Sequence, residues 1–291
     1  MKPLIYGTAE YNALKKEALT LYGVTPTENF DVKAAIRNRI DFLKKQLRDT
    51  GMNGYVLGVS GGVDSTTASR LAQLACEELR AEGYFAQFIG ERLPAGVQAD
   101  EADAQAAIKF INPDKLITVN IGEAAKNLAI QGVQQFIKLE GEDKLTAQRQ
   151  DFNLGNLKAR LRMTSQYQIG AMYNALILGT DHSTEGVCGF WTKWADGSCD
   201  SLILDGLDKT QVRLVAKELG APEFLWNKEA TADLEELSPQ KKDEDALGIK
   251  FNILDSFLEG NEIDKDIEFK IIRQFYITQH KRKPIPGFTT Q

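Results

Sequence analysis

Cysteine and histidine are scarce in this chain of 291 residues, which contains three cysteines and two histidines. The cysteines (Cys76, Cys188 and Cys199) show no C-x-x-C spacing, which argues against a thiolate zinc site and against a dithiol redox pair. A metal site built from three histidines is excluded, because only His182 and His280 are available. Such low cysteine usage is typical of a reducing compartment, so we expect a cytoplasmic protein.

Long apolar runs and an excess of positive charge are also missing. No stretch approaches the roughly 18 apolar residues that cross a bilayer, and no apolar signal region follows Met1. The formal net charge is −6, which argues against a protein that binds nucleic acid or a membrane surface mainly by electrostatics. We expect one soluble globular domain over residues 1–291, with residues 1–30 as an N-terminal extension.

A glycine-rich junction follows the apolar residues 55–57. It reads Gly58-Val59-Ser60-Gly61-Gly62-Val63-Asp64-Ser65. Adjacent glycines let backbone N–H groups approach an anion closely, and a helix that begins near Ser65 points its positive end at the same place. The junction therefore predicts a phosphate site.

The same junction lacks a lysine, which narrows its interpretation. Without a lysine before the final serine it is not a P-loop, and it does not have the G-x-G-x-x-G spacing of a dinucleotide fingerprint. It carries Asp64 instead, and a carboxylate repels phosphate unless a divalent cation lies between them. We therefore predict a nucleotide bound together with Mg²⁺.

Strand and helix patterns alternate along the chain. The expected strands are residues 54–59, a segment within 84–93, 115–121 and 176–180. The expected helices are residues 32–50, 64–80, 98–111, a segment ending near 138, 155–175, 208–219 and 263–278. We expect residues 141–154 to be a loop, and the highly charged residues 228–245 to be either a surface loop or a lid.

This alternation predicts an α/β fold of three layers, α/β/α, with a parallel sheet and helical extensions. Ligands bind such sheets at the carboxyl ends of the strands. Ser60 and Thr180 both follow expected strands, so we expect them to share one crevice.

A second polar segment reads Gly179-Thr180-Asp181-His182-Ser183-Thr184-Glu185-Gly186. A hydrolase triad with Asp181 and His182 is disfavoured, because the chain has no G-x-S-x-G elbow. A structural interpretation, in which Asp181 is a turn residue and His182 is hydrogen-bonded in a loop, is as consistent with the sequence as any functional role for these two residues. Glu185 is more informative, since it and Asp64 follow adjacent strands and can share a Mg²⁺ that bridges phosphates.

A third segment places Asn156, Arg160 and Tyr167 at spacings of four and seven, which puts them on one helix face. Spacing alone favours an amphipathic helix with a solvated basic side over a substrate-binding face.

Taken together, these segments resemble a known family. The loop Ser60-Gly61-Gly62-Val63-Asp64-Ser65 resembles the pyrophosphate loop of the N-type ATP pyrophosphatases, whose members split ATP between its α and β phosphates and adenylate their substrates. Within that superfamily the second and third segments resemble the ammonia-dependent NAD synthetases. Three later stretches agree: Phe190-Trp191-Thr192-Lys193-Trp194-Ala195-Asp196-Gly197, Thr231-Ala232-Asp233-Leu234 and His280-Lys281-Arg282. The resemblance is collinear from about residue 30 to residue 283.

The resemblance implies an adenine nucleotide alpha hydrolase-like fold and roles for individual residues. It implies that Asp64 and Glu185 ligate Mg²⁺ and that these two and Lys209 are catalytic. The residues expected to contact ATP are Gly58, Ser60, Gly61, Gly62, Val63, Asp64, Ser65, Arg92, Thr180, Lys209 and Thr231. The residues expected to bind deamido-NAD are Phe152, Asn156, Arg160, Lys193, Asp200, His280 and Lys281. Structural alternatives remain open for some of these residues. Lys193 and Lys209 could be solvated surface lysines, Asp200 could be a turn residue, and residues 280–283 could be a solvated tail.

The implied reaction is the ATP-dependent amidation of deamido-NAD by ammonia through an acyl-adenylate, giving NAD, AMP and pyrophosphate. The length favours ammonia over glutamine, whose hydrolysis needs a further catalytic domain. The alternatives are a GMP synthetase-like ligase or a tRNA-modifying ligase of the same superfamily, and a non-catalytic nucleotide sensor. Acidic charge and the absence of C-x-x-C pairs disfavour a tRNA enzyme, and both metal carboxylates disfavour a sensor. Family members are usually homodimers, so a homodimer is expected.

Overall fold

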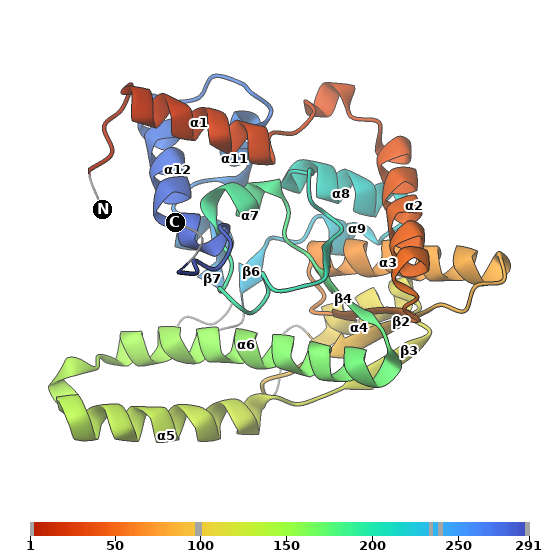
Figure 1. Cartoon of the computed structure of the whole chain (residues 1–291), viewed down its shortest axis with the longest axis horizontal. Helices are drawn as coiled ribbons and strands as arrows, with labels where there is room; N and C mark the ends of the chain where they lie inside the picture. The colour runs from red at the N-terminus through yellow and green to blue at the C-terminus, as the bar shows by residue number, and fades with distance from the viewer. Residues whose placement is uncertain (1–2, 97–100, 233–234, 238–240, 289–291) are drawn as a thin grey trace.

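A five-stranded parallel sheet lies at the centre of the protein (Figure 1). The computed structural model describes residues 3–96, 101–232, 235–237 and 241–288. The strands are β1 (Gly54–Gly58), β2 (Gln87–Arg92), β3 (Lys115–Thr118), β4 (Leu176–Gly179) and β5 (Ser201–Leu202). Their order, β3-β2-β1-β4-β5, reverses direction between β1 and β4, and a crevice at the carboxyl ends of these two strands is where such sheets bind ligands.

One face of the sheet carries the largest apolar core. It is covered by α2 (Val32–Thr50), α3 (Val63–Ala81) and α8 (Lys209–Glu218), with α4 (Glu101–Ile111) and α9 (Glu223–Trp226) beside α3. Leu43 of α2, Leu71 of α3 and Val212 of α8 are fully buried in this cluster. Helical spacing of apolar residues in each helix produces this face, as the sequence predicts.

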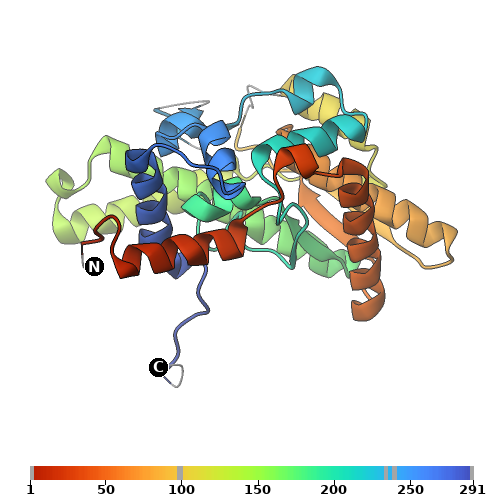
Figure 2. The same cartoon turned by 90° about the horizontal axis from the view of Figure 1, so that it is seen from above.

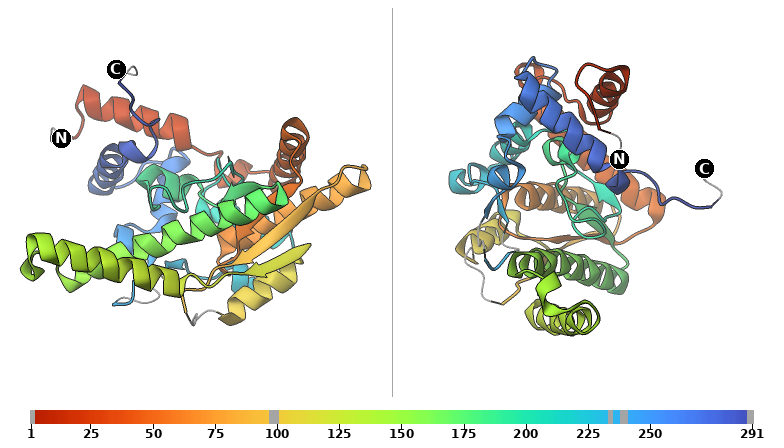
Figure 3. Two further views of the ribbon diagram at one scale, coloured as in Figure 1. Left: turned by 60° about the horizontal axis from the view of Figure 1, so that its bottom comes forward. Right: turned by 90° about the vertical axis from the view of Figure 1, so that its left-hand side faces the viewer.

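The other face is covered by one long helix. That helix is α6 (Ala147–Tyr173), and α5 (Gly122–Glu140) lies outside it as the second arm of a hairpin (Figure 3). Val56, Ile89 and Ile177 of the sheet pack against Tyr167 and Tyr173 of α6. The predicted three-layer α/β/α arrangement is therefore confirmed.

The prediction of a loop at 141–154 is wrong. After a short turn of 3-10 helix, η2 (Glu142–Lys144), α6 begins at Ala147. Thr146 caps it, because its side chain accepts a hydrogen bond from the backbone N–H of Arg149. The first turns of α6 are largely exposed, so their polar composition is that of a solvated helix and not of a loop.

A second helical cluster packs beside the sheet (Figure 2). It contains α1 (Ala9–Tyr22), α7 (Ser183–Cys188), α11 (Phe251–Leu258) and α12 (Lys265–Ile277). Tyr11 of α1 is buried, and its hydroxyl donates to Glu268 Oε1 of α12 at 2.7 Å. Helices α1 and α11 were not predicted. The remaining short elements are η1 (Thr27–Asn29), α10 (Asp243–Leu247) and η3 (Gln279–Lys281).

The charged segment 228–245 contains a small antiparallel hairpin. Its strands are β6 (Thr231–Ala232) and β7 (Lys241–Lys242). Asp233 and Leu234 of the family stretch Thr231–Leu234 lie outside the described residues, as do 98–100 at the start of the predicted helix 98–111. Within the ranges that the structure describes, none of the helices has the length and apolar character needed to span a membrane.

Candidate active site

The loop between β1 and α3 has a shape that only glycine allows at one position. Gly61 has a φ of +88°, and a Cβ added there would lie 2.8 Å from the backbone nitrogen of Ala104 in α4. Helix α3 begins two residues later, and no side chain of the described residues caps its N-terminus at Gly62. The first N–H groups of a 19-residue helix therefore face the crevice, where they favour an anion.

Two serines hold this loop in place. Ser60 Oγ accepts from the backbone N–H of Gly62 at 3.2 Å and lies 3.0 Å from Ser65 Oγ. Ser65 Oγ in turn donates to the Gly62 carbonyl at 3.2 Å. These bonds fix the curvature of the loop and so pre-position the N–H groups at the start of α3.

A cavity of about 320 Å³ opens at the carboxyl ends of β1 and β4. The predicted ATP-contact residues that line it are Gly58, Ser60, Gly62, Val63, Asp64, Ser65, Thr180, Lys209 and Thr231. Its size is within the range of small-ligand sites. The expected shared crevice of Ser60 and Thr180 therefore exists.

Two further residues predicted to contact ATP lie apart from this lining. Gly61 is buried beneath the loop, against Ala104. Arg92 is buried at the end of β2, and its guanidinium donates to both carboxylate oxygens of Glu101 at 3.0 and 2.7 Å. Arg92 is thus held by Glu101 of α4 and does not line the cavity.

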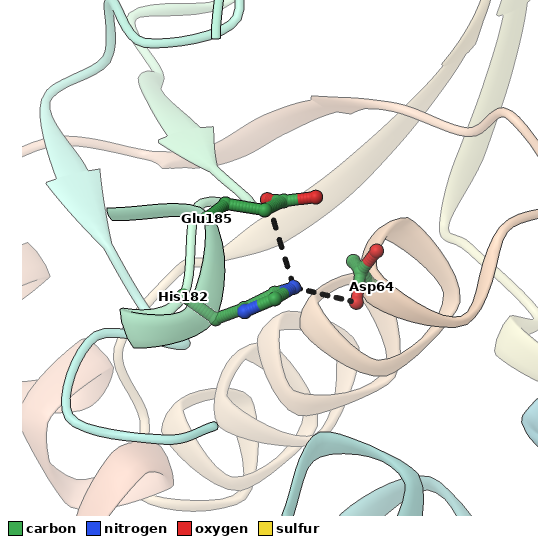
Figure 4. A group of neighbouring side chains, drawn as sticks. All are labelled: Asp64, His182 and Glu185. Atoms are coloured by element: carbon green, nitrogen blue, oxygen red, sulfur yellow. Dashed lines mark ion pairs between the residues drawn. The ribbon is translucent and has the colours of Figure 1, made fainter. Parts of the chain in front are cut away.

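Asp64 and Glu185 approach each other as predicted, with His182 between them (Figure 4). His182 Nε2 lies 3.6 Å from Asp64 Oδ1 and 3.6 Å from Glu185 Oε2, and one ligand atom from each residue falls within 4.8 Å of the others. Two carboxylates beside an anion-binding loop form the oxygen-rich donor set that Mg²⁺ prefers. The residues present therefore fit a divalent cation.

Lys209 completes this cluster from α8. Its Nζ lies 2.8 and 2.6 Å from the two carboxylate oxygens of Asp64 and 3.4 Å from His182 Nε2. The side chain is fully buried, which contradicts the alternative of a solvated surface lysine. His182 was not assigned a role from the sequence, although its position three residues before Glu185 was a signal for one.

Burial and charge set the protonation of the cluster. Burial raises the pKa of Glu185 well above its usual range, with the Asp64 carboxylate adding to the shift and the Lys209 ammonium opposing it. Burial also acts to raise the pKa of Asp64, but Lys209, His182 and Arg213 together outweigh it, and this pKa lies below its ordinary value. Burial lowers the pKa of His182 to about 3, so its imidazole is neutral. The Lys209 ammonium thus faces the carboxyl groups of Asp64 and Glu185. A divalent cation bound here would favour the ionised form of both carboxyl groups.

Several residues predicted to bind deamido-NAD gather around the segment that follows α7. Thr192 Oγ1 donates to Asn156 Oδ1 at 2.9 Å, and Arg160 Nε donates to the carbonyl of Lys193 at 3.3 Å. Lys281 Nζ donates to the carbonyl of Gly189 at 2.8 Å. The first residues of α6, the segment after α7 and η3 therefore meet at one place, although they are far apart in the sequence.

The other three residues of that set behave differently. Phe152 is exposed one turn before Asn156, and His280 is exposed beside Lys281. Asp200 Oδ2 accepts from the backbone N–H of Ile177 at 2.7 Å, at the start of β5. This contact supports the alternative of a structural role for Asp200, and the structure does not bring it to the group around Asn156.

Comparison with known proteins agrees with this arrangement. The sequence model described as NAD synthase matches residues 35–285. The chain belongs to the NAD synthase family. The predicted family is therefore confirmed, and with it the prediction of a ligase of NAD biosynthesis. The match begins within α2, so α1 and η1 lie outside the part that the family model covers.

Named members of the NAD synthase family are similar over most of their length. The NH(3)-dependent NAD(+) synthetase of Bacillus subtilis (strain 168) is 49% identical over 255 residues, which covers 88% of this chain and 90% of the relative. That of Aliivibrio fischeri (strain MJ11) is 47% identical over 266 residues, covering 89% and 94%.

Solved structures of the family share the fold. The NAD+ synthetase from Burkholderia pseudomallei is 43% identical, with a TM-score of 0.77 over 94% of this chain and 96% of that one. The NMN synthetase from Francisella tularensis is 28% identical, with a TM-score of 0.75 over 90% of this chain and all of that one.

Proposed function

We propose that the protein is an ammonia-dependent NAD synthetase. It would amidate deamido-NAD with ammonia and convert ATP to AMP and pyrophosphate. The observation that carries this proposal is the junction of an anion-binding loop, two carboxylates and a buried lysine at the carboxyl ends of β1 and β4, in a chain 49% identical to an NH(3)-dependent NAD(+) synthetase.

In this proposal the ATP phosphates bind the β1–α3 loop. The N–H groups at the start of α3 and the hydroxyls of Ser60 and Ser65 hold the pyrophosphate that will leave. Asp64 and Glu185 would hold Mg²⁺, and the chemistry this ion would supply is neutralisation of phosphate charge. Lys209 Nζ then has a second role beside Asp64, because it can donate to the same phosphates as charge develops.

The acceptor would lie against α6 and the segment after α7. Arg160, Lys193 and Lys281 carry positive charge around Asn156, which suits the diphosphate of a dinucleotide. Asn156 is held by Thr192, so α6 and this segment would present their side chains to one ligand together.

The chemistry requires an adenylated acceptor. A nicotinate carboxylate does not react with ammonia directly, because oxide is a very poor leaving group. Attack of a carboxylate oxygen on the α phosphate forms a C–O–P link and releases pyrophosphate. Ammonia then forms the amide C–N bond, loses a proton, and displaces AMP with the electron pair of the broken C–O bond.

Water competes with ammonia for the acyl-adenylate, so the site must be covered. We assign this role to residues 228–245. Lys228 Nζ lies 2.7 Å from Asp103 of α4, and Asp151 of α6 accepts from the backbone N–H groups of Glu236 and Leu237 at 2.7 and 2.8 Å. These anchors hold the described residues of the segment against α4 and α6, and Lys228 and Thr231 line the cavity.

We propose a homodimer formed through the α5–α6 hairpin, in a cytoplasmic protein. Of the residues of α5, only Ala125 is buried, while Leu128, Ile130 and Leu139 are exposed. Exposed apolar side chains on a protruding hairpin suit a second copy of the same hairpin. Light scattering would test this: Leu128→Glu should convert dimer to monomer, whereas the exposed Leu21→Glu in α1 should not.

Turnover by the purified protein tests the reaction itself. With ATP, Mg²⁺, ammonium and deamido-NAD we expect equal amounts of AMP and NAD⁺, with no ADP. Nicotinate mononucleotide should be tried in parallel, because one structural relative is an NMN synthetase. Turnover of the mononucleotide alone would reassign the acceptor, and formation of ADP would refute cleavage between the α and β phosphates.

A further inference from the structure

Helix α8 begins with the buried lysine of the site, so the start of this helix sets where its ammonium lies. The first N–H groups of any helix lack partners within the helix. Asp208 supplies one, since its Oδ1 accepts from the backbone N–H of Gln211 at 2.8 Å, while Gln211 completes a capping box. The N–H groups of Lys209 and Thr210 need partners from elsewhere in the fold.

Asp255, on α11, supplies those partners. Its Oδ2 accepts from both the backbone N–H and the hydroxyl of Thr210, at 3.0 and 2.7 Å. Its Oδ1 accepts from the hydroxyl of Thr184 at 2.7 Å, and Thr184 Oγ1 accepts from the backbone N–H of Lys209 at 2.8 Å. Asp255 is 5% exposed, so these bonds are shielded from water.

The same carboxylate therefore connects two parts of the site. Thr184 immediately precedes Glu185 on α7, and Thr210 immediately follows Lys209 on α8. Oδ1 of Asp255 accepts from Thr184 on α7 and, at 3.4 Å, from the backbone N–H of Lys209, and Oδ2 accepts from Thr210 on α8. Loss of these bonds would remove the link between the backbone next to Glu185 and the backbone next to Lys209.

We propose that Asp255 is a positioning residue that sets the spacing between the Glu185 carboxylate and the Lys209 ammonium, and thereby the binding of Mg²⁺-nucleotide. The proposal rests on the proposed function for its catalytic readout. Asparagine cannot reproduce this arrangement, because its amide has one acceptor oxygen, and its NH₂ would face the backbone N–H of either Lys209 or Thr210.

The test compares Asp255→Asn with Glu268→Gln. Glu268 is a matched control, since it is also buried, lies on the next helix and accepts from Tyr11 and Lys15, away from the site. For Asp255→Asn we expect kcat to fall at least about tenfold and the Mg²⁺ concentration for half-maximal rate to rise, with KM for deamido-NAD unchanged. Glu268→Gln should lower the melting temperature and leave all three quantities unchanged well below it.

A second readout does not depend on turnover. Calorimetry with Mg²⁺ and α,β-methylene-ATP, which cannot be cleaved between those phosphates, should show weaker binding for Asp255→Asn than for the unmodified protein. Thr184→Val removes only the relay to Lys209 and should produce a smaller change of the same kind, so it carries the test if Asp255→Asn does not fold.

Each outcome has one meaning. Unchanged kcat and unchanged nucleotide binding in folded Asp255→Asn and Thr184→Val would overturn the positioning role. A lower melting temperature with no other change would do the same, because it describes a purely structural carboxylate. Absence of deamido-NAD turnover by the unmodified protein would refute the proposed function, while the calorimetry would still decide the role of Asp255.

Discussion

Lys209 Nζ lies 2.6 Å from one carboxylate oxygen of Asp64 and 2.8 Å from the other, although 145 positions separate the two residues in the sequence. The contact joins the start of α8 to the start of α3 at the carboxyl end of β1. It places a buried cation beside the one carboxylate of the glycine-rich β1–α3 loop. The proposed chemistry depends on this relationship, and the first prediction tests it.

Replacing Lys209 with methionine should lower kcat/KM for ATP by about 10²–10³-fold, because a buried donor to developing phosphate charge is lost. Mg²⁺ binding should not weaken, since the cation no longer competes with an ammonium for Asp64. Steady-state kinetics and Mg²⁺ titration measure the two effects. Lys217→Met, an exposed lysine of the same helix, is the control and should leave both unchanged. Near-normal turnover by Lys209→Met would rule out its catalytic role.

Gly61→Ala should raise KM for ATP at least about tenfold, because the added Cβ would displace the loop from α4 and misplace its N–H groups. Gly83→Ala is a matched control: its φ is +83°, close to the +88° of Gly61, but a Cβ there meets nothing within 4 Å. It should lose about 1 kcal/mol of stability through backbone strain alone and keep its KM. Equal KM values in the two variants would show that the loop tolerates the shift.

Asp151→Asn should loosen the segment 228–245, because an amide cannot accept from both backbone N–H groups that the carboxylate now binds. Water would then reach the acyl-adenylate, and AMP would form in excess of NAD⁺. Measuring both products in one reaction gives this ratio. Asp114→Asn also removes a carboxylate that accepts from a backbone N–H, at Phe88, and should keep the ratio at unity. A ratio of one in Asp151→Asn would argue against a covering role.

The loss of folding stability at acidic pH should depend in part on Glu78. Hydrogen bonds from Arg37, aided by Lys44, lower the pKa of Glu78 to about 2, against an ordinary value of 4.5. The folded state binds its proton less readily than the unfolded state. This contribution is therefore complete above about pH 4.5 and is lost as pH falls towards about 2.

Urea unfolding at several pH values checks this. Glu78→Gln should be less stable than the unmodified protein near neutral pH, and the difference should vanish in acid. The Glu78 side chain is 35% exposed, so solvent screening limits the difference to about 1 kcal/mol. Glu10→Gln, at an exposed position of α1, should show no such convergence. A difference that is the same at all pH values would contradict the ion-pair explanation.

The family and the layer arrangement were predictable because they depend on local patterns. The glycine-rich loop after a buried strand, and the alternation of strand and helix periods, both lie within short windows of sequence. The prediction of a loop at 141–154 was wrong because it also depended on a local pattern. An exposed polar helix has few apolar residues, so its helical period cannot be detected in the sequence. Helices α1 and α11 were missed because their apolar faces are buried by elements distant in sequence: α7 and α12 for α1, and α7 and α8 for α11.

The sequence by itself determined that a glycine-rich loop with a carboxylate follows β1 and that a second carboxylate, Glu185, follows a neighbouring strand. Only the tertiary structure decided that Lys209 neutralises Asp64, that His182 lies between the two carboxylates, and that Asp255 holds both helices of the site. It also showed that the Asp200 carboxylate accepts a hydrogen bond from the backbone N–H of Ile177 in β4. The physical reason is that these contacts depend on how α7, α8 and α11 pack against one another, and hydrogen bonds a few ångströms long between distant segments leave no period in the sequence.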